Sequence, residues 1–277
     1  MITVVLAAGY ATRLYPLTKN FPKPLLEIGG NTILGRMLDD LDTVPDITEH
    51  IIVTNHKFAP VFQEWADRRE GTKPVTIIDD GTSTNDTRLG AVCDLLLVLE
   101  KSSLEKSSPS KSSPSKSSLL REDLGGSGGS GGSDGSDLLV VAADNLLFFS
   151  FQEFVDFAKA KGTSCIMCHE QPSIEKLQRT GVVELDEDMR VLGMEEKPQV
   201  PKSHWAVPPF YIYLKQDLDL VRHAVENGCG KDAPGNLAHY MVEHTTMHAW
   251  PMSAGRFDIG SLDTYYEACA LAQSGKI

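Results

Sequence analysis

The chain has 277 residues, of which 41% are hydrophobic and 23% are charged, so it can form one large α/β domain or two small ones. Its net charge of -12 disfavours non-specific binding to nucleic acid or to an anionic membrane. No apolar run reaches the roughly 18 residues of a membrane span, and no basic leader precedes the first strand. The five cysteines, an odd number, are typical of reduced thiols. We therefore expect a cytoplasmic protein.

The first half of the chain alternates predicted strands and helices. Short apolar runs predict strands at residues 2–6, 50–54, 75–78 and 138–143. Apolar residues at helical spacing predict helices over residues 32–41 and 87–100, the second with Asp86 as its N-cap. Ser150 and Glu153 form a capping-box pattern that opens a third helix, and Gly162 ends it. This alternation is typical of a mostly parallel sheet with helices on both faces.

The second half is expected to complete the sheet and to cover a ligand. Closely spaced strand candidates lie at residues 181–185, 190–194 and 210–214, and the polar residues 186–189 form a turn suited to a hairpin. Helices are predicted near residues 216–226, 236–243 and 262–272. We therefore expect a single domain over residues 1–277, with a mostly parallel mixed sheet and an α/β fold.

Residues 101–136 interrupt this order. Four consecutive pentads begin with Lys-Ser-Ser, and a Gly/Ser tract follows over residues 125–136. Neither part has enough apolar surface to offset the entropy of ordering it. We interpret the segment as a flexible Ser/Gly-rich insertion between a helix and a strand, where loop length costs little. A partner or modification site is the alternative, because Pro109 and Pro114 each follow a serine.

The most specific signal follows the first strand. Leu6-Ala-Ala-Gly-Tyr-Ala-Thr-Arg-Leu-Tyr-Pro-Leu-Thr18 is followed by Phe21-Pro-Lys-Pro-Leu-Leu26. A loop of small residues after a buried strand lets backbone N–H groups approach phosphate oxygens, and a planar guanidinium suits phosphate. Lys23 lies between two prolines, which hold it on a stiff segment. On its own, the pattern is also compatible with a tight turn that carries two solvated cations.

These two segments together closely resemble the signature of the sugar-nucleotide pyrophosphorylases, the thymidylyl-, uridylyl- and guanylyltransferases that act on sugar 1-phosphates. The resemblance extends over nearly the whole chain apart from the insertion, and it implies a Rossmann-like nucleotidyltransferase fold. It also implies that Arg13 and Lys23 bind and neutralise the triphosphate of the nucleotide. Ala8 and Gly9 are then expected to lie beside the nucleotide.

Two further segments resemble parts of the same family. Asn85-Asp-Thr-Arg-Leu-Gly-Ala91 occupies the place of a family segment near the base, so Asn85 and Gly90 are candidates for nucleotide binding. Gly181-Val-Val-Glu184 and Glu195-Glu-Lys-Pro198 resemble the family's Y-G-V-V-E and E-K-P. The resemblance implies that Gly181 and Glu196 contact the sugar and that Lys197 holds its 1-phosphate. In isolation, Glu196 and Lys197 are more typical of an exposed charged strand end before Pro198.

Two aspartates complete the expected site. Asp144 ends the apolar run Leu138-Leu-Val-Val-Ala-Ala-Asp, at the strand end where open α/β sheets bind ligands. It resembles the aspartate of the family's G-D-N, and Asp258 in Phe257-Asp-Ile-Gly260 resembles that of its D-x-G. The resemblance makes Asp144 and Asp258 ligands of Mg²⁺, which favours a few carboxylates together with phosphate oxygens and waters. Each aspartate alone is more typical of a cap or a turn.

The resemblance therefore implies an enzyme that transfers a nucleoside monophosphate, from dTTP or UTP by preference, to a sugar 1-phosphate and releases pyrophosphate. One alternative is a cytidylyltransferase for a phospho-alcohol such as phosphocholine, which shares the loop without the sugar contacts. A second is a non-catalytic nucleotide-binding regulatory protein, because Ala11 replaces the loop's usual second glycine and Pro208-Pro209 interrupt a family sugar-binding segment. The sequence does not determine which base and which sugar the enzyme uses. It also leaves the oligomeric state open, and a homo-oligomer is one of the alternatives.

Overall fold

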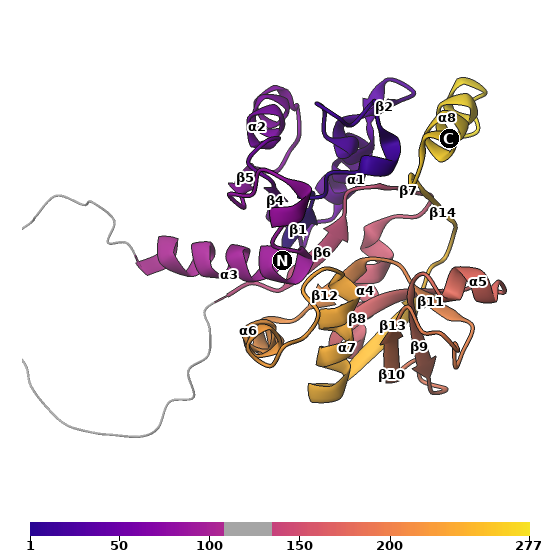
Figure 1. The fold of residues 1–277 in the computed structure, drawn as a ribbon. Helices are drawn as coiled ribbons and strands as arrows, with labels where there is room; N and C mark the ends of the chain where they lie inside the picture. The colour runs from indigo at the N-terminus through magenta and orange to yellow at the C-terminus, as the bar shows by residue number, and fades with distance from the viewer. Residues whose placement is uncertain (108–134) are drawn as a thin grey trace, which may run out of the picture.

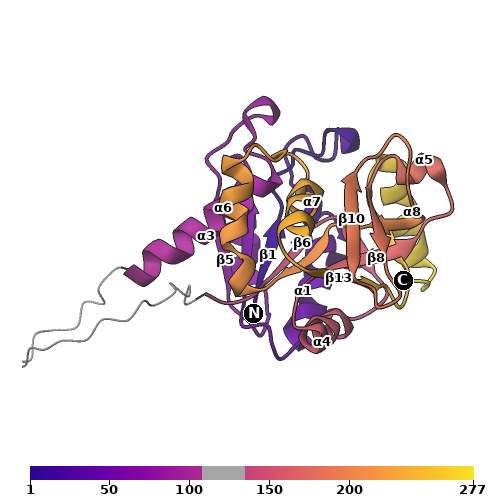
Figure 2. The same ribbon diagram turned by 90° about the horizontal axis from the view of Figure 1, so that it is seen from below.

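The computed structural model describes residues 1–107 and 135–277, so most of the predicted insertion at residues 101–136 lies outside the described residues. A large mixed sheet runs through the molecule, with helices on both of its faces (Figures 1 and 2). The predicted α/β class is thereby confirmed. None of the helices in the described ranges combines the length and apolar character that a membrane crossing needs.

Ten of the described strands form the large sheet: β1 (Ile2–Leu6), β4 (Glu49–Thr54), β5 (Val75–Asp79), β6 (Leu138–Ala142), β8 (Ser164–Glu170), β9 (Gly181–Leu185), β10 (Val191–Glu196), β11 (Trp205–Val207), β12 (Phe210–Tyr213) and β13 (Met247–Pro251). Their order is β10-β9-β11-β8-β12-β6-β1-β4-β5, with β13 also paired to β8. The pairs β4–β5, β1–β4 and β1–β6 are parallel, and β12 is antiparallel to both β6 and β8. Two small antiparallel ribbons pair β2 (Glu27–Ile28) with β3 (Asn31–Thr32), and β7 (Asn145–Leu147) with β14 (Arg256–Asp258).

Two apolar cores lie on the two faces of this sheet. The described helices are α1 (Ile33–Thr43), α2 (Ala59–Arg68), α3 (Ala91–Ser107), α4 (Phe151–Lys161), α5 (Ile174–Leu177), α6 (Asp219–Glu226), α7 (Pro234–His244) and α8 (Leu262–Gln273). Val4 packs in one core with residues of α3, α6 and α7, whereas Val5 packs in the other with residues of α1, α2 and α4. This alternation along β1 explains why four of its five residues are apolar, because both of its faces are covered.

The start of α3 differs from the prediction. Residues Asn85–Thr87 form a single 3₁₀ turn, and Gly90 takes a left-handed backbone with φ of 91° before the helix begins at Ala91. Asp86 therefore lies in the 3₁₀ turn and does not cap α3. The helix then continues to Ser107, past residue 101, where the insertion was expected to begin.

The other predicted elements are found close to their expected positions. Ser150 caps α4 through a hydrogen bond from Gln152 N at 3.2 Å, whereas Glu153 N donates to the Ser150 carbonyl. The expected hairpin is formed by β9 and β10, and Asp186 Oδ1 accepts hydrogen bonds from two backbone N–H groups of the turn. The sequence analysis missed α2, α5 and the short strands β2, β3, β7, β11 and β14.

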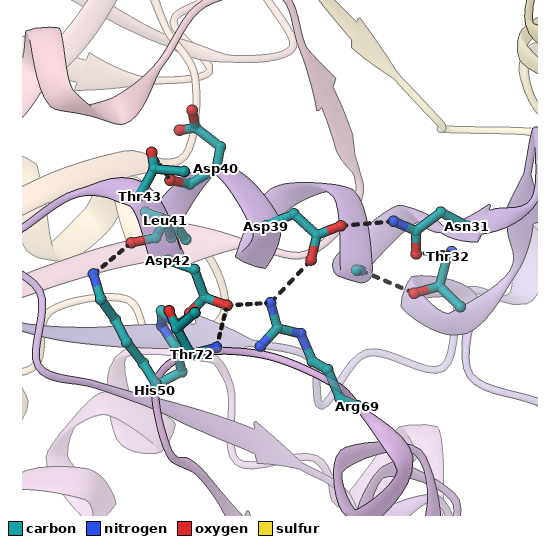
Figure 3. A network of polar contacts seen from close by, with 12 residues as sticks. Asn31, Thr32, Asp39, Asp40, Leu41, Asp42, Thr43, His50, Arg69 and Thr72 are labelled. Atoms are coloured by element: carbon teal, nitrogen blue, oxygen red, sulfur yellow. Dashed lines mark hydrogen bonds and ion pairs between the residues drawn. The ribbon is translucent and has the colours of Figure 1, made fainter.

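A buried polar network lies at the edge where the parallel strands begin (Figure 3). Asp42 of α1 accepts hydrogen bonds from His50 Nε2 at 3.0 Å, Arg69 Nη2 at 2.8 Å and Thr72 N at 3.0 Å. His50 lies at the start of β4, and Thr72 lies in the loop before β5. The network therefore fastens the loop before β5 to α1, on the opposite edge from the phosphate-binding loop predicted after β1.

Candidate active site

The loop after β1 turns at the carboxyl edge of the parallel strands. Ala8 O accepts a hydrogen bond from Asn55 Nδ2 at 3.0 Å, which fixes the first part of the loop to the end of β4. Gly9 is exposed, and a Cβ atom built on it would meet no atom within 4 Å. The backbone beside Gly9 is therefore open to a ligand.

Ala11 takes a left-handed backbone, with φ of 46° and ψ of 45°. Glycine takes this conformation at the lowest cost, because it has no Cβ atom. The Thr18 hydroxyl donates to the Ala11 carbonyl at 2.8 Å and holds the turn. The loop thus keeps a turn that suits glycine, although an alanine occupies the position.

Lys23 and Arg13 lie on two short 3₁₀ turns, Lys23–Leu25 and Thr12–Leu14. Pro22 has an extended backbone, with ψ of 134°, and Lys23 opens its 3₁₀ turn although the proline that follows it disfavours a helical backbone. Lys23 is only 9% exposed, and its Nζ lies 2.9 Å from Asp144 Oδ2. Arg13 is exposed at the same edge.

Asp144 and Asp258 lie close together, held by the β7–β14 ribbon. Asn145 is the register partner of Asp258, and Ile259 N donates to the Asp144 carbonyl at 3.0 Å. Burial raises the pKa of Asp258, and the negative charge of Asp144 raises it further, whereas Arg256, Lys23 and Arg13 oppose this rise. The structure therefore brings Arg13, Lys23, Asp144 and Asp258 into one group.

A second group contains Gly181, Glu196 and Lys197. A Cβ atom built on Gly181 would lie 3.2 Å from Glu196 Oε2, so this glycine leaves room for the carboxylate. Lys197 has a left-handed backbone with φ of 52°, its N donates to Thr180 O at 3.0 Å, and its Nζ lies 3.6 Å from Glu196 Oε1. Burial raises the pKa of Glu196, and the charge of Lys197 opposes the rise.

The Pro208-Pro209 segment lies between the two groups. Pro209 O accepts a hydrogen bond from Ala142 N at 3.1 Å, two residues before Asp144. Val207 O accepts one from the Thr180 hydroxyl at 2.9 Å, next to Gly181. The two prolines that depart from the family pattern thus lie between the end of β6 and the start of β9.

Asn85 and Gly90 lie on a third side, against the segment before α7. A Cβ atom on Gly90 would lie 2.5 Å from Lys231 O, so glycine is required there by packing as well as by its φ. Arg88 donates to Asp232 Oδ1 at 2.8 Å and to Asn85 Oδ1 at 3.2 Å. The expected base segment is therefore fastened to residues 231–232.

Sequence reasoning missed three participants: Gly235, Asn145 and Arg256. Gly235, in the first turn of α7, leaves space for the Glu196 carboxylate, because a Cβ atom there would lie 2.9 Å from Glu196 Cδ. Asn145 Nδ2 donates to Asp144 Oδ1 at 2.8 Å, and Arg256 Nη1 donates to Asn145 Oδ1. The Asp144-Asn145 pair was a visible signal for Asn145, whereas Arg256 lies just outside the motif that begins at Phe257.

The donor set fits Mg²⁺. Residues 1–107 and 135–277 contain no group of three or more His, Cys, Asp or Glu residues that could hold a metal ion. The described residues therefore do not form a metal site whose ligands all come from the protein. Two neighbouring carboxylates that repel each other are instead the set that Mg²⁺ uses when substrate phosphates and waters complete its octahedron.

A family model named nucleotidyl transferase matches residues 2–104 and 129–275, which is most of the chain. The chain belongs to this family. A glucose-1-phosphate adenylyltransferase of Geobacillus stearothermophilus is 23% identical over 283 residues, 96% of this chain and 64% of the enzyme. A glucose-1-phosphate thymidylyltransferase of Neisseria gonorrhoeae is 23% identical over 274 residues, 98% of this chain and 82% of the enzyme. The chain spans only 60–66% of the length of three adenylyltransferases that it matches.

Solved structures of nucleotidyltransferases share the fold. A UDP-glucose pyrophosphorylase in complex with UDP-glucose superposes with a TM-score of 0.74 at 16% identity, over 99% of this chain and 98% of that one. A thymidylyltransferase-like protein of Bacillus anthracis, solved with sucrose, gives a TM-score of 0.69 at 19% identity, over 99% and 96% of the two chains. The family and the fold that the loop signature implied are both confirmed.

Proposed function

We propose that this protein transfers a nucleoside monophosphate from a nucleoside triphosphate to a sugar 1-phosphate, with release of pyrophosphate. The observation that carries the proposal is the group formed by Arg13, Lys23, Asp144 and Asp258 at the carboxyl edge of the parallel strands. Two cations and two carboxylates gathered in one place suit a triphosphate and the divalent cation that accompanies it. Relatives named for glucose 1-phosphate with adenylyl or thymidylyl transfer support the same reaction class.

In the proposed reaction, an oxygen of the sugar 1-phosphate attacks the α-phosphorus, and the bond from that phosphorus to the bridging oxygen of pyrophosphate breaks. A phosphate dianion is already a nucleophile, so the work of the protein is positioning and charge neutralisation. Arg13 and Lys23 hold the triphosphate, and Lys197 holds the phosphate of the sugar. Mg²⁺ bound by Asp144 and Asp258 would supply further neutralisation of phosphate charge.

Gly181 and Glu196 are proposed to contact the sugar. The Glu196 carboxylate lies between Gly181 and Gly235, and its side chain is 18% exposed. An acceptor held in such a partly buried position suits hydrogen bonds from sugar hydroxyls. Asn85 and Gly90 are proposed to lie beside the nucleotide, with Ala8 and Gly9 along its phosphates.

We infer that dTTP or UTP is the preferred nucleotide and glucose 1-phosphate the sugar phosphate, in a cytoplasmic enzyme. The relatives named above include adenylyl- and thymidylyltransferases and a UDP-glucose pyrophosphorylase, so ATP must be tested alongside. We further propose that residues 1–277 form one nucleotidyltransferase domain.

The test is pyrophosphate release with ATP, CTP, GTP, UTP and dTTP, each combined with several sugar 1-phosphates and with phosphocholine. We expect turnover with a sugar 1-phosphate and its loss in Asp144→Asn, while Asp156→Asn on the exposed face of α4 keeps the wild-type rate. Turnover with CTP and phosphocholine alone would favour the phospho-alcohol alternative. Nucleotide binding without turnover in any combination would favour a regulatory protein.

A further inference from the structure

Arg256 stands directly behind the two aspartates. It lies on β14, whose antiparallel pairing with β7 sets Arg256 opposite Leu147 and Asp258 opposite Asn145 (Figure 1). Its Nη1 donates to Asn145 Oδ1 and lies 4.0 Å from Asp258 Oδ1. The side chain is 20% exposed, so the positive charge is held mostly away from solvent.

The arginine fixes the orientation of the Asn145 amide. A guanidinium can only donate hydrogen bonds, so the atom of Asn145 that faces it must be the carbonyl oxygen. The amide nitrogen then faces Asp144, and it donates to Oδ1 at 2.8 Å. If the amide were reversed, its oxygen would oppose the carboxylate of Asp144 and the contact would become repulsive.

Asp144 is thereby held by one donor on each oxygen. Lys23 Nζ lies 2.9 Å from Oδ2, and Asn145 Nδ2 donates to Oδ1. Asn145 is 1% exposed, so its side chain has little freedom to turn away. The rotation of the Asp144 carboxylate is therefore set on one side by Lys23, which is proposed to hold the triphosphate. On the other side it is set by the hydrogen bonds that lead from Arg256 through Asn145.

The placement of Arg256 supports these hydrogen bonds but leaves one of its own donors without a partner among the described residues. Its buried Nε has no hydrogen-bond partner among the described residues, and a buried unpaired donor is unfavourable. The guanidinium nevertheless lies where one nitrogen reaches Asn145 and its charge lies near Asp258. Such a position is expected of a residue that orients metal ligands from behind.

We propose that Arg256 is a positioning residue that sets the orientation of the Asp144 carboxylate through Asn145, and that of Asp258 through its charge, toward a divalent cation. This inference rests on the proposed function, because it takes Asp144 and Asp258 as the cation ligands. It assigns no contact between Arg256 and substrate.

The test measures Mn²⁺ binding to the substrate-free protein by electron paramagnetic resonance, so that the readout does not depend on turnover. We expect Arg256→Met and Asn145→Leu each to weaken Mn²⁺ binding about 10-fold, as is typical for residues that support metal ligands. Because Arg256 acts on Asp144 only through Asn145, the double variant should bind Mn²⁺ less weakly than the product of the two single effects. Arg256→Lys should recover part of the affinity, since its ammonium can donate to Asn145 Oδ1.

Arg222→Met is the matched control, because Arg222 lies on α6 and pairs with Glu100 at 3.1 Å. It should bind Mn²⁺ as the wild type does. Circular dichroism establishes that each variant is folded, and Arg256→Lys takes the place of Arg256→Met in the cycle if the latter does not fold.

Two results would overturn the inference while leaving the proposed function intact. One is wild-type Mn²⁺ affinity in Arg256→Met, or in Arg256→Lys where that variant replaces it. The other is a double variant in which the two single effects multiply. If the wild-type protein binds no Mn²⁺, or if Asp144→Asn binds it equally well, Asp144 and Asp258 are not the cation ligands and this inference falls, whereas the proposed transfer reaction is decided by pyrophosphate release.

Discussion

Lys23 Nζ and Asp144 Oδ2 lie 2.9 Å apart, although 121 residues separate them along the chain. The parallel pairing of β1 with β6, which aligns Leu6 with Ala142, brings the two segments that follow these strands to one edge. The ion pair therefore depends on sheet topology rather than on local sequence. It joins the lysine of the loop signature to the first of the two aspartates in one site.

Replacing Lys23 tests the cationic half of the site. Lys23→Met keeps the length of the side chain and removes its charge, so triphosphate charge is neutralised less well in the transition state. We expect kcat for pyrophosphate release to fall by about 10²–10³, by analogy with the loss of one donor to a developing oxyanion. Lys176→Met on the exposed face of α5 is the control, and it should leave kcat unchanged. Equal rates in the two variants would contradict the role of Lys23.

Ala11 offers a test of stability in the same loop. Its left-handed φ of 46° is strained for any residue with a Cβ atom, so Ala11→Gly should raise the free energy of unfolding by about 0.5–1 kcal/mol. The matched control is Ala270→Gly in the interior of α8, which should lower it by about 1 kcal/mol. Urea unfolding measures both. A loss of stability in Ala11→Gly would show that the alanine is not strained.

The sequence predicted the strands of the parallel half well, because strands covered on both faces are mostly apolar. The start of α3 was wrong for a physical reason: Asp86 satisfies the local rule for an N-cap, but Gly90 takes a left-handed backbone packed against Lys231. That contact joins residues far apart in sequence, and a local pattern does not contain it. The short strands β7 and β14 were missed because three residues carry no periodicity.

The site was predictable to the extent that the family signature names its residues. The signature supplied Lys23 and Asp144, and the structure places these two in contact. Arg256 belongs to no quoted motif, and its role depends on a strand pairing that only the folded chain contains. Gly235 likewise has no meaning until α7 packs beside the end of β10. The individual roles of these residues stay predictions.

Gly235 provides a test of the sugar half. A Cβ atom there would lie 2.9 Å from Glu196 Cδ, so in Gly235→Ala the carboxylate must move away. Because Glu196 is proposed to bind the sugar, we expect KM for the sugar 1-phosphate to rise about 10-fold, the equivalent of ~1.4 kcal/mol, with KM for the nucleotide unchanged. Gly193→Ala on the same strand β10 is the control, since its Cβ would lie at an ordinary 3.4 Å from Glu184. An unchanged KM for the sugar phosphate in Gly235→Ala would separate Glu196 from sugar binding.

The network around Asp42 makes stability depend on pH (Figure 3). Burial lowers the pKa of His50, although the hydrogen bond to Asp42 opposes this, so the imidazole binds a proton less readily in the folded protein than in the unfolded chain. Burial acts to raise the pKa of Asp42, but hydrogen bonds from His50, Arg69 and Thr72 bring it below its usual value. Both shifts mean that the unfolded chain binds protons more readily than the folded one, so acid favours unfolding.

The two residues act in different pH windows, which allows them to be separated. The contribution of His50 to the free energy of unfolding is fully present above its unfolded pKa of about 6.5. It is lost as the pH falls below that value, and the free energy of unfolding then decreases by at most ~1.4 kcal/mol per pH unit. The contribution of Asp42 to the free energy of unfolding is lost only as the pH falls below about 4.

The variant His50→Gln keeps an N–H donor for Asp42 and cannot titrate, so its free energy of unfolding should change less between pH 7 and pH 5 than that of the wild type. His223→Gln on the exposed face of α6 should keep the wild-type slope. Urea unfolding at half-unit pH intervals measures this, and identical slopes for His50→Gln and wild type would show that His50 does not couple folding to protons.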